Sequence, residues 1–188
     1  NGPWGWANIN GGSSGLLKGN KGSVYEGGYR VPAIAWMPGR IPEVTTTALA
    51  STLDFFPTLV SLAGGEYEKK FLDGVDIRKT FFENSNVRTD VHYYRQDTLI
   101  ALRYNEWKMY IKDPNPWDDG PTQKDMPLLY NVEQDPSEKY NIVKENKEIV
   151  KVLNDLASEH IQSVLKTPSQ YDEILPSYQS AYNEYNKK

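Results

Sequence analysis

Glycine is concentrated at the start of the chain, where nine of the 14 glycines fall within the first 32 residues. Glycine weakens helices and strands because it loses more backbone freedom on folding than any other residue. The stretch NGPWGWANINGGSSGLLKGNKGSVYEGGYRVP is therefore predicted to be irregular. Because glycines let a backbone and a ligand approach each other closely, we interpret residues 1–30 as a functional loop.

Two apolar segments follow the loop and indicate the trailing edge of an α/β sheet. Residues 31–37 (VPAIAWM) form a continuous apolar run closed by Pro-Gly, which is typical of a buried strand that starts at a proline. Residues 51–63 show helical periodicity, with Ser51 or Asp54 as the capping residue. The side chains expected to face inward are those of Leu59, Val60, Leu62 and Ala63. A strand followed by a helix, both apolar, favours an α/β architecture up to residue 83.

The pattern changes from residue 84, where short runs rich in β-forming residues follow one another. Four strands are predicted, at residues 91–95, 98–104, 106–112 and 128–132. Apolar residues then recur at helical spacing between charged ones, which predicts a long amphipathic helix over 144–166. Residues 84–166 are therefore expected to form a small α+β subdomain, an antiparallel sheet of about four strands with this helix against it. Residues 167–188 are interpreted as a polar C-terminal tail.

Charge and composition argue against several classes of protein. The chain has 21 basic and 25 acidic side chains and a net charge of -4, whereas a general nucleic-acid binder needs a basic face. No run of about 18 apolar residues occurs, so no membrane span is predicted. Cysteine is absent, which excludes disulfides and thiolate metal sites within these residues.

The residues alone do not form a complete catalytic set. Neither histidine, His92 or His160, belongs to a known catalytic motif, and both are interpreted as structural. Asn1 carries a neutral oxygen that suits a hard divalent cation. Lys21 stands between an asparagine and a glycine, where little side-chain bulk would keep a sulfate or phosphate away. For a single lysine in such a loop, plain exposure to solvent is the competing interpretation.

One long stretch of the loop matches a family pattern. The segment GSSGLLKGNKGSVYEGGYRVPAIAWMPGRI resembles the signature of the type I sulfatases, the formylglycine-dependent arylsulfatases. In that family a sequence close to GxSGxLxxGKGxxxEGGxRxPxxxxxPGxI follows an Asp-Asn-Gly metal motif. The likeness continues in ALASTLDFFPTLVSLAGG, LDGVDI and PLLYNVEQDPSEKYNI. Within the family, DVHYYRQDTLIALRYNEWKMYI is most similar to the N-acetylgalactosamine-6-sulfatases and arylsulfatase A, and its YYRxDTL run leans toward the former.

The resemblance implies a fold and a set of roles. Residues 1–83 correspond to the C-terminal end of the catalytic domain of an alkaline-phosphatase-like sulfatase fold. Asn1 corresponds to a ligand of the active-site calcium, and Lys21 to the catalytic lysine that holds the sulfate group. Glu26 and Arg30 are expected to form a structural ion pair that supports the loop. The implied enzyme is a sulfuric ester hydrolase acting on a sulfated small molecule or saccharide, such as a glycosaminoglycan, in a secreted, periplasmic or lysosomal setting.

The chain also departs from the family pattern. The family's nucleophile is a formylglycine made from the Cys or Ser of a C/S-x-P-x-R motif, and no such motif occurs here. We therefore expect a C-terminal fragment that needs the missing N-terminal portion of the same enzyme, with the nucleophile and most calcium ligands upstream. Alone, such a fragment is expected to be inactive.

Two other functions stay open at this point. One is a phosphoester or phosphonate hydrolase of the same superfamily, which would share the metal-centred core. The other is a non-catalytic carbohydrate-binding or structural domain, in which Trp4, Trp6 and Trp117 would serve as platforms for sugar rings.

Overall fold

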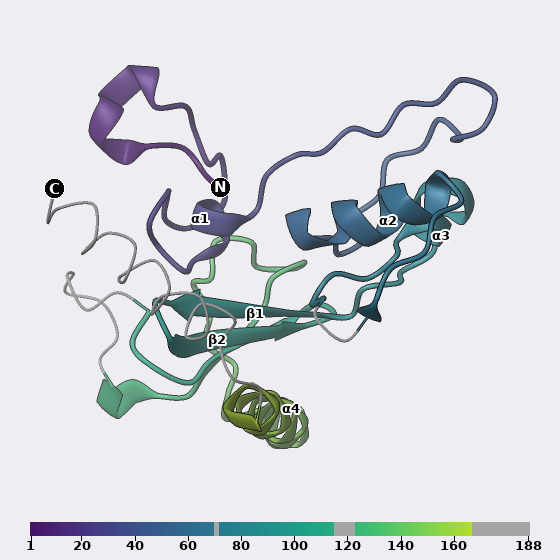
Figure 1. Ribbon diagram of the computed structural model, residues 1–188. Coiled ribbons are helices and arrows are strands. Elements are labelled where there is room, and N and C mark those ends of the chain that lie inside the picture. The colour runs from purple at the N-terminus through teal and green to yellow at the C-terminus, as the bar shows by residue number, and fades with distance from the viewer. Residues whose placement is uncertain (70–71, 115–122, 167–188) are drawn as a thin grey trace, which may run out of the picture. The chain divides into compact units, whose positions relative to one another are not determined.

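The computed structural model describes residues 1–69, 72–114 and 123–166 (Figure 1). Residues 1–150 form one compact unit and residues 151–188 a second, of which residues 151–166 are described. The predicted tail at 167–188 lies outside the described residues, and the predicted boundary between residues 83 and 84 stays a prediction.

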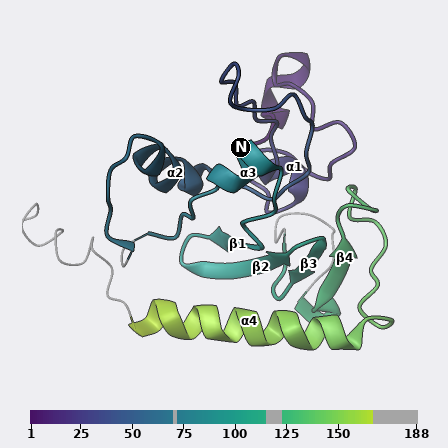
Figure 2. The same ribbon diagram turned by 90° about the vertical axis from the view of Figure 1, so that its right-hand side faces the viewer.

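The first unit contains a four-stranded antiparallel sheet, as predicted (Figure 2). Its strands are β1 (Asp90–Arg95), β2 (Thr98–Tyr104), β3 (Trp107–Tyr110) and β4 (Leu128–Asn131), and they neighbour one another in sequence order. The connection between β2 and β3 has two residues, and in it Asn105 takes a φ of 51°, a left-handed conformation that asparagine tolerates. Two-residue connections, here and between β1 and β2, let β1, β2 and β3 pair as local hairpins, whereas residues 111–127 separate β3 from β4.

The register of the sheet divides the strand residues between two faces, and both faces are buried at the centre. One face carries Leu102, Met109 and Leu129, which are fully buried. The other face carries Arg103 and Lys108, also buried, beside aromatic and apolar side chains. A cluster of buried residues joins strand residues to the end of the glycine-rich loop; it comprises Val24, Tyr25, Tyr93, Ile100, Ala101, Tyr110, Leu128, Tyr130 and Val132.

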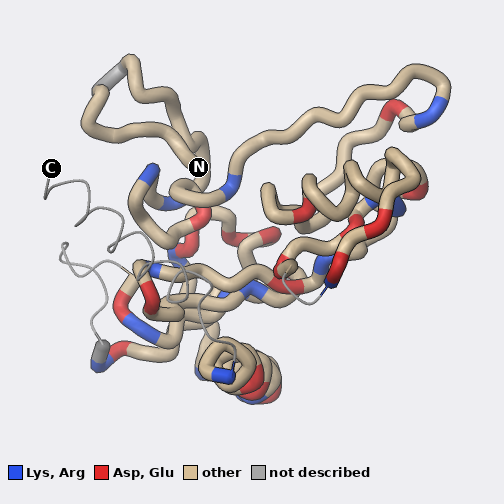
Figure 3. The backbone as a smooth tube through the Cα atoms, in the orientation of Figure 1, with Lys and Arg blue, Asp and Glu red and all other residues tan. Residues whose placement is uncertain are grey.

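The predicted long helix is confirmed as α4 (Lys147–Lys166). Its buried residues are Leu153 and Ala157, and its other positions carry both signs of charge, as the red and blue segments of Figure 3 show. Across the described part of the chain, no helix combines the length and apolar character needed to cross a membrane.

Other helical elements are short. They are η1 (Gly5–Asn10), α1 (Glu26–Tyr29), η2 (Thr52–Asp54), α2 (Phe55–Leu62), α3 (Arg78–Glu83) and η4 (Gln123–Asp125). The helix predicted at 51–63 is confirmed as η2 followed by α2, and the two capping candidates act together. Ser51 Oγ accepts from the N–H of Leu53, and the carboxylate of Asp54 accepts from the N–H of Ser51 at 2.7 Å.

The inward face predicted for this helix is wrong in part. Leu59 is 60% exposed and Ala63 is also exposed, whereas Pro57 and Thr58 are buried. The reason is a polar contact, because Thr58 Oγ1 accepts from the buried N–H of Ile77 at 3.0 Å. The helix therefore turns Thr58 toward the rest of the unit, leaves Leu59 and Ala63 exposed, and half-buries Val60 and Leu62.

Residues 31–37 do not form the predicted strand. They lie in an irregular, extended segment whose side chains are mostly exposed, with Ile34 at 96% and Trp36 at 83%. A parallel strand needs neighbours on both sides and cover on both faces. Among the described residues the only sheet is the antiparallel one of β1 to β4, which does not include this segment. An apolar run without a partner strand therefore stays unpaired.

Candidate functional site

The glycine-rich loop lies on the short turn α1. Three backbone hydrogen bonds define the arrangement: the N–H of Gly2 donates to Gly28 O (2.9 Å), that of Gly27 to Lys18 O (2.7 Å), and that of Lys21 to Pro3 O (2.8 Å). The start of the chain, the lysine-bearing part of the loop and α1 are thus tied to one another through their main chains.

Glycines 27 and 28 make this close approach possible. A Cβ atom on Gly27 would lie 2.3 Å from Gly19 O, and one on Gly28 would lie 2.1 Å from Ser23 O. Both distances are far shorter than a carbon and an oxygen tolerate, so any other residue would push the loop away from α1. The Gly-Gly pair is required because backbone packs directly against backbone.

The two residues predicted from the sequence to bind ligands lie near one another along this scaffold. Lys21 is exposed, and its Nζ atom lies 5.9 Å from the ring centre of Trp4. Asn1 is exposed and lines an open hollow of about 300 Å³, together with Arg30. Lys21 is not among the residues that line this hollow. The structure therefore brings together the backbones that carry Asn1 and Lys21, but it does not place both side chains in one pocket.

The fit of this region to a calcium ion is partial. The side-chain oxygen of Asn1 is a ligand type that calcium accepts. Calcium takes six to eight oxygen ligands, often with several carboxylates. In the described part of the chain no group of three or more His, Cys, Asp or Glu residues could hold a metal. In the described residues Asn1 therefore has the ligand type that was predicted, without a carboxylate-rich group of the kind that calcium sites often contain.

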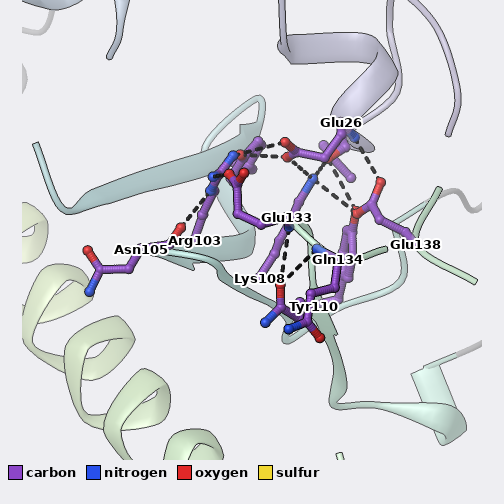
Figure 4. A network of polar contacts seen from close by, with 11 residues as sticks. Glu26, Arg103, Asn105, Lys108, Tyr110, Glu133, Gln134 and Glu138 are labelled. Atoms are coloured by element: carbon purple, nitrogen blue, oxygen red, sulfur yellow. Dashed lines mark hydrogen bonds and ion pairs between the residues drawn. The ribbon is translucent and has the colours of Figure 1, made fainter. Parts of the chain in front are cut away.

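Behind α1 lies a buried network of charged side chains (Figure 4). Glu26 is its central carboxylate: Oε1 accepts from Tyr93 Oη (2.9 Å) and Lys108 Nζ (2.9 Å), and Oε2 accepts from Arg103 Nη1 (3.1 Å). Each of these donors comes from a different strand. The predicted ion pair between Glu26 and Arg30 is therefore wrong, because the sheet supplies two cations to the same carboxylate and Arg30 lies at the hollow instead.

A second carboxylate completes the network. Glu138 accepts from the backbone N–H of Glu26 (2.9 Å) and from the hydroxyl of Tyr110, and its Oε1 lies 3.2 Å from Lys108 Nζ. Burial of Glu26 opposes its ionisation, but the charges of Lys108 and Arg103 outweigh this and hold the pKa of its carboxyl below the usual range. Burial, helped by the nearby carboxylates, raises the pKa of Tyr93 and Tyr110 well above the ordinary value, so both remain hydrogen-bond donors.

Sequence reasoning missed Arg103, Lys108 and Glu138 as parts of this network. A signal was present, because Arg103 and Lys108 interrupt strands that are otherwise apolar or aromatic, and the two are paired across the sheet. A charge in such a run is ordinarily taken as the solvent-facing position. Only the contact with Glu26, 77 and 82 residues away in sequence, shows that these cations are buried.

Two of the three tryptophans proposed as sugar platforms lie in the described residues, and both are exposed. Trp6 is 89% exposed and Trp4 is 56% exposed, so both indole rings are accessible from solvent. Trp117 lies outside the described residues.

Comparison with known proteins places the chain in a family. The family model for the C-terminal region of aryl-sulfatase matches residues 86–184, and the sulfatase model matches residues 8–65. Arylsulfatase A of Bos taurus is 33% identical over 87% of this chain and 34% of its own length. N-acetylgalactosamine-6-sulfatase of Canis lupus familiaris is 31% identical over 76% of this chain and 32% of its own length. Sequence identity alone therefore does not assign the chain to one of these two branches of the family.

Solved structures agree in fold. A protein from a study of glycosaminoglycan metabolism by Bacteroides thetaiotaomicron superposes with a TM-score of 0.67 and 27% identity, over 82% of this chain and 34% of the other. The chain spans about a third of the length of the curated relatives it matches. With one family model covering more than half of its residues, the chain belongs to the sulfatase family, whose members are sulfuric ester hydrolases.

Proposed function

We propose that this chain supplies the sulfate-binding loop and the C-terminal sheet of an enzyme that hydrolyses sulfate esters of saccharides. The observation that carries the proposal is the attachment of the loop to α1, which ties the backbone of Lys21 to that of Pro3 and the backbone of Gly2 to that of Gly28. A loop held in this way can present a cation at a fixed place, although its glycines would otherwise leave it mobile.

Lys21 is the group that would hold the sulfate. Its ammonium is exposed, and the residues on either side of it, Asn20 and Gly22, are small. Charge moves among the sulfate oxygens during hydrolysis, and a preorganised cation beside those oxygens stabilises the transition state more than the free ester. The role requires a lysine whose backbone is fixed and whose ammonium group can reach an anion.

Asn1 would contribute one neutral oxygen to a calcium ion. A bound calcium and a formylglycine would supply a Lewis acid and a nucleophile, and we propose that both depend on residues outside these 188. This chain would then be inactive when isolated. What its own residues do is limited to orienting the ion through Asn1 and neutralising the ester through Lys21.

The proposed substrate class is a sulfated saccharide. Support comes from the similarity to an N-acetylgalactosamine-6-sulfatase and to the structure from the study of glycosaminoglycan metabolism. The exposed ring of Trp4 near Lys21 adds an aromatic surface of the kind on which sugar rings stack. Both matched family models are sulfatase models, which favours a sulfate ester over a phosphoester.

The test compares two lysines of the same loop in an enzyme that carries these residues together with its formylglycine-bearing portion. Lys21→Ala is expected to lower kcat/KM for an aryl sulfate by on the order of a hundredfold, because one electrostatic contact to the transition state is lost. Lys18→Ala is the matched control, since Lys18 lies over the ring of Tyr25 at 4.2 Å and is given no role in catalysis.

Two outcomes would contradict the proposal. Equal activity of Lys21→Ala and the wild type would remove Lys21 from the site. Sulfate ester hydrolysis by the 188-residue chain alone, at a rate comparable with the assembled enzyme, would show that the nucleophile lies within these residues.

A further inference from the structure

Glu26 belongs both to the buried network and to the turn on which the loop lies. Its side chain is held by donors from β1, β2 and β3. The next two residues, Gly27 and Gly28, hold the loop through the peptide groups that bond Lys18 and Gly2. A displacement of Glu26 would therefore move the backbone to which both ends of the loop are attached.

Lys108 has the largest part in fixing Glu26. Its ammonium is fully buried and contacts three oxygens from three segments: Val24 O (2.9 Å), Glu26 Oε1 (2.9 Å) and Glu138 Oε1 (3.2 Å). The first two contacts are hydrogen bonds that Lys108 donates, and the third is an ion pair. Lys108 thus connects β3 to Val24, to Glu26 at the start of α1, and to Glu138, which follows β4.

The charges inside the network balance. Glu26 and Glu138 are two buried carboxylates, and Arg103 and Lys108 are two buried cations. Arg103 also pairs at 2.7 Å with Glu133, a residue on the surface. Removing Lys108 would leave an excess of negative charge in the interior, directly beside α1, where water cannot compensate for it.

We propose that Lys108 is a positioning residue for Lys21, acting through Glu26 and the backbone of the loop. This inference rests on the function proposed above for Lys21. Without Lys108, α1 would lose its fixed place on the sheet, and the loop that lies on it would sample more positions. The sulfate-binding ammonium would then spend less time where the ester needs it, although Lys108 itself touches no substrate.

The first test measures hydrogen exchange in the 188-residue chain and needs no activity. Lys108→Met is expected to speed exchange of the Gly27 and Lys21 amides by about tenfold or more, because their acceptors are no longer held in place. Arg88→Met is the matched control. It breaks a buried ion pair outside the network, that of Arg88 with Asp54, neither of which belongs to the loop or to α1.

The two variants are compared at equal global stability, set with urea, so that only local effects remain. Faster exchange at both loop amides in Lys108→Met alone supports the proposal. An equal change in both variants, or none in either, overturns it.

Two further variants keep the test valid if Lys108→Met does not fold. Tyr93→Phe removes one hydrogen bond to Glu26 Oε1 and changes no charge, so a smaller rise in exchange is expected at the same amides. The double variant Lys108→Met/Glu138→Gln removes one charge of each sign and keeps the interior neutral. If both variants fold and neither changes exchange of Gly27 or Lys21, the proposal is wrong.

The second test is a double-mutant cycle on kcat in the enzyme that carries these residues with its nucleophile. Lys108→Met is expected to lower kcat by about tenfold when Lys21 is present and to have no effect in the Lys21→Ala background. An equal loss in both backgrounds would mean that Lys108 does not act through Lys21. Wild-type kcat in Lys21→Ala would refute the function proposed for Lys21, whereas hydrogen exchange would still decide whether Lys108 holds the loop.

Discussion

The four-stranded sheet and the segment 31–62 are both rich in apolar residues, yet the sheet buries most of them and the segment leaves most of them exposed. Leu102 and Met109 in the sheet are inaccessible to solvent, whereas Ile34, Trp36 and Leu59 are exposed. The strands of the sheet pair with their sequence neighbours, and two-residue connections join β1 to β2 and β2 to β3. Apolar composition is thus not enough for burial, because a strand also needs a partner within reach.

The same comparison applies to charge. The sheet buries two cations and α1 a carboxylate, and each of these groups has a partner of opposite sign at hydrogen-bond distance. Buried charges without such partners would be strongly unfavourable. In the part of the chain that the structure describes, no buried side-chain nitrogen or oxygen lacks a hydrogen-bond partner. A charged side chain is therefore tolerated in the interior when a partner of opposite charge or a hydrogen-bond partner is buried with it.

The difference in stability should be greatest between a buried and an exposed leucine. Leu102→Ala, at the centre of the sheet, is expected to lower the free energy of unfolding by about 2 to 5 kcal/mol, because a cavity replaces fully buried atoms. Leu59→Ala, on the exposed side of α2, is expected to change it by less than about 0.5 kcal/mol. Urea denaturation followed by circular dichroism measures both. Similar losses in the two variants would contradict the difference between the regions.

A smaller effect is expected from acid. The folded-state pKa of Glu26 lies below its ordinary value of 4.5, so its contribution to stability is fully present above about pH 4.5 and disappears as the pH falls through the folded pKa. The difference in unfolding free energy between the wild type and Glu26→Gln should therefore shrink as the pH falls from 7 toward 3. Urea denaturation at several pH values measures it. A difference that stays constant or grows in acid would contradict the pairing of Glu26 with Lys108 and Arg103.

The smallest effect on stability is expected in the exposed segment. Ile34→Ser and Trp36→Ser should change the free energy of unfolding by less than about 0.5 kcal/mol. They should nevertheless reduce self-association, since an unpaired apolar segment offers both hydrophobic surface and backbone hydrogen-bonding groups to another chain. Size-exclusion chromatography over a range of concentrations tests this, with Tyr140→Ser, at another exposed aromatic residue, as the control. Unchanged association in both segment variants would contradict the prediction.

Local patterns predicted the sheet and the long helix well. The predicted ends of the four strands lie within two residues of the observed ends, because runs of β-forming residues joined by two-residue connections specify the first two hairpins locally. The long helix followed from its apolar spacing. Residues 31–37 were predicted wrongly for the same reason, since a continuous apolar run indicates a buried strand but says nothing about whether its neighbours are present.

The candidate site was less accessible to pattern reasoning. Asn1 and Lys21 were selected through resemblance to the sulfatases, and their roles stay predictions. Glu26 was expected to pair with Arg30, four residues away, because short-range pairs are the ones that a sequence makes visible. Its actual partners, Lys108 and Arg103, are brought to it by the fold.

Amide hydrogen exchange on the wild-type chain compares the loop bearing Lys21, which is held on α1, with the apolar segment that follows it, which is not held. We expect strong protection for the amides of Lys21, Gly27 and Gly28, which donate hydrogen bonds within the scaffold. For the amides of residues 31–37 we expect exchange close to that of an unfolded chain. Strong protection throughout residues 31–37, or rapid exchange of the three loop amides, would contradict this difference.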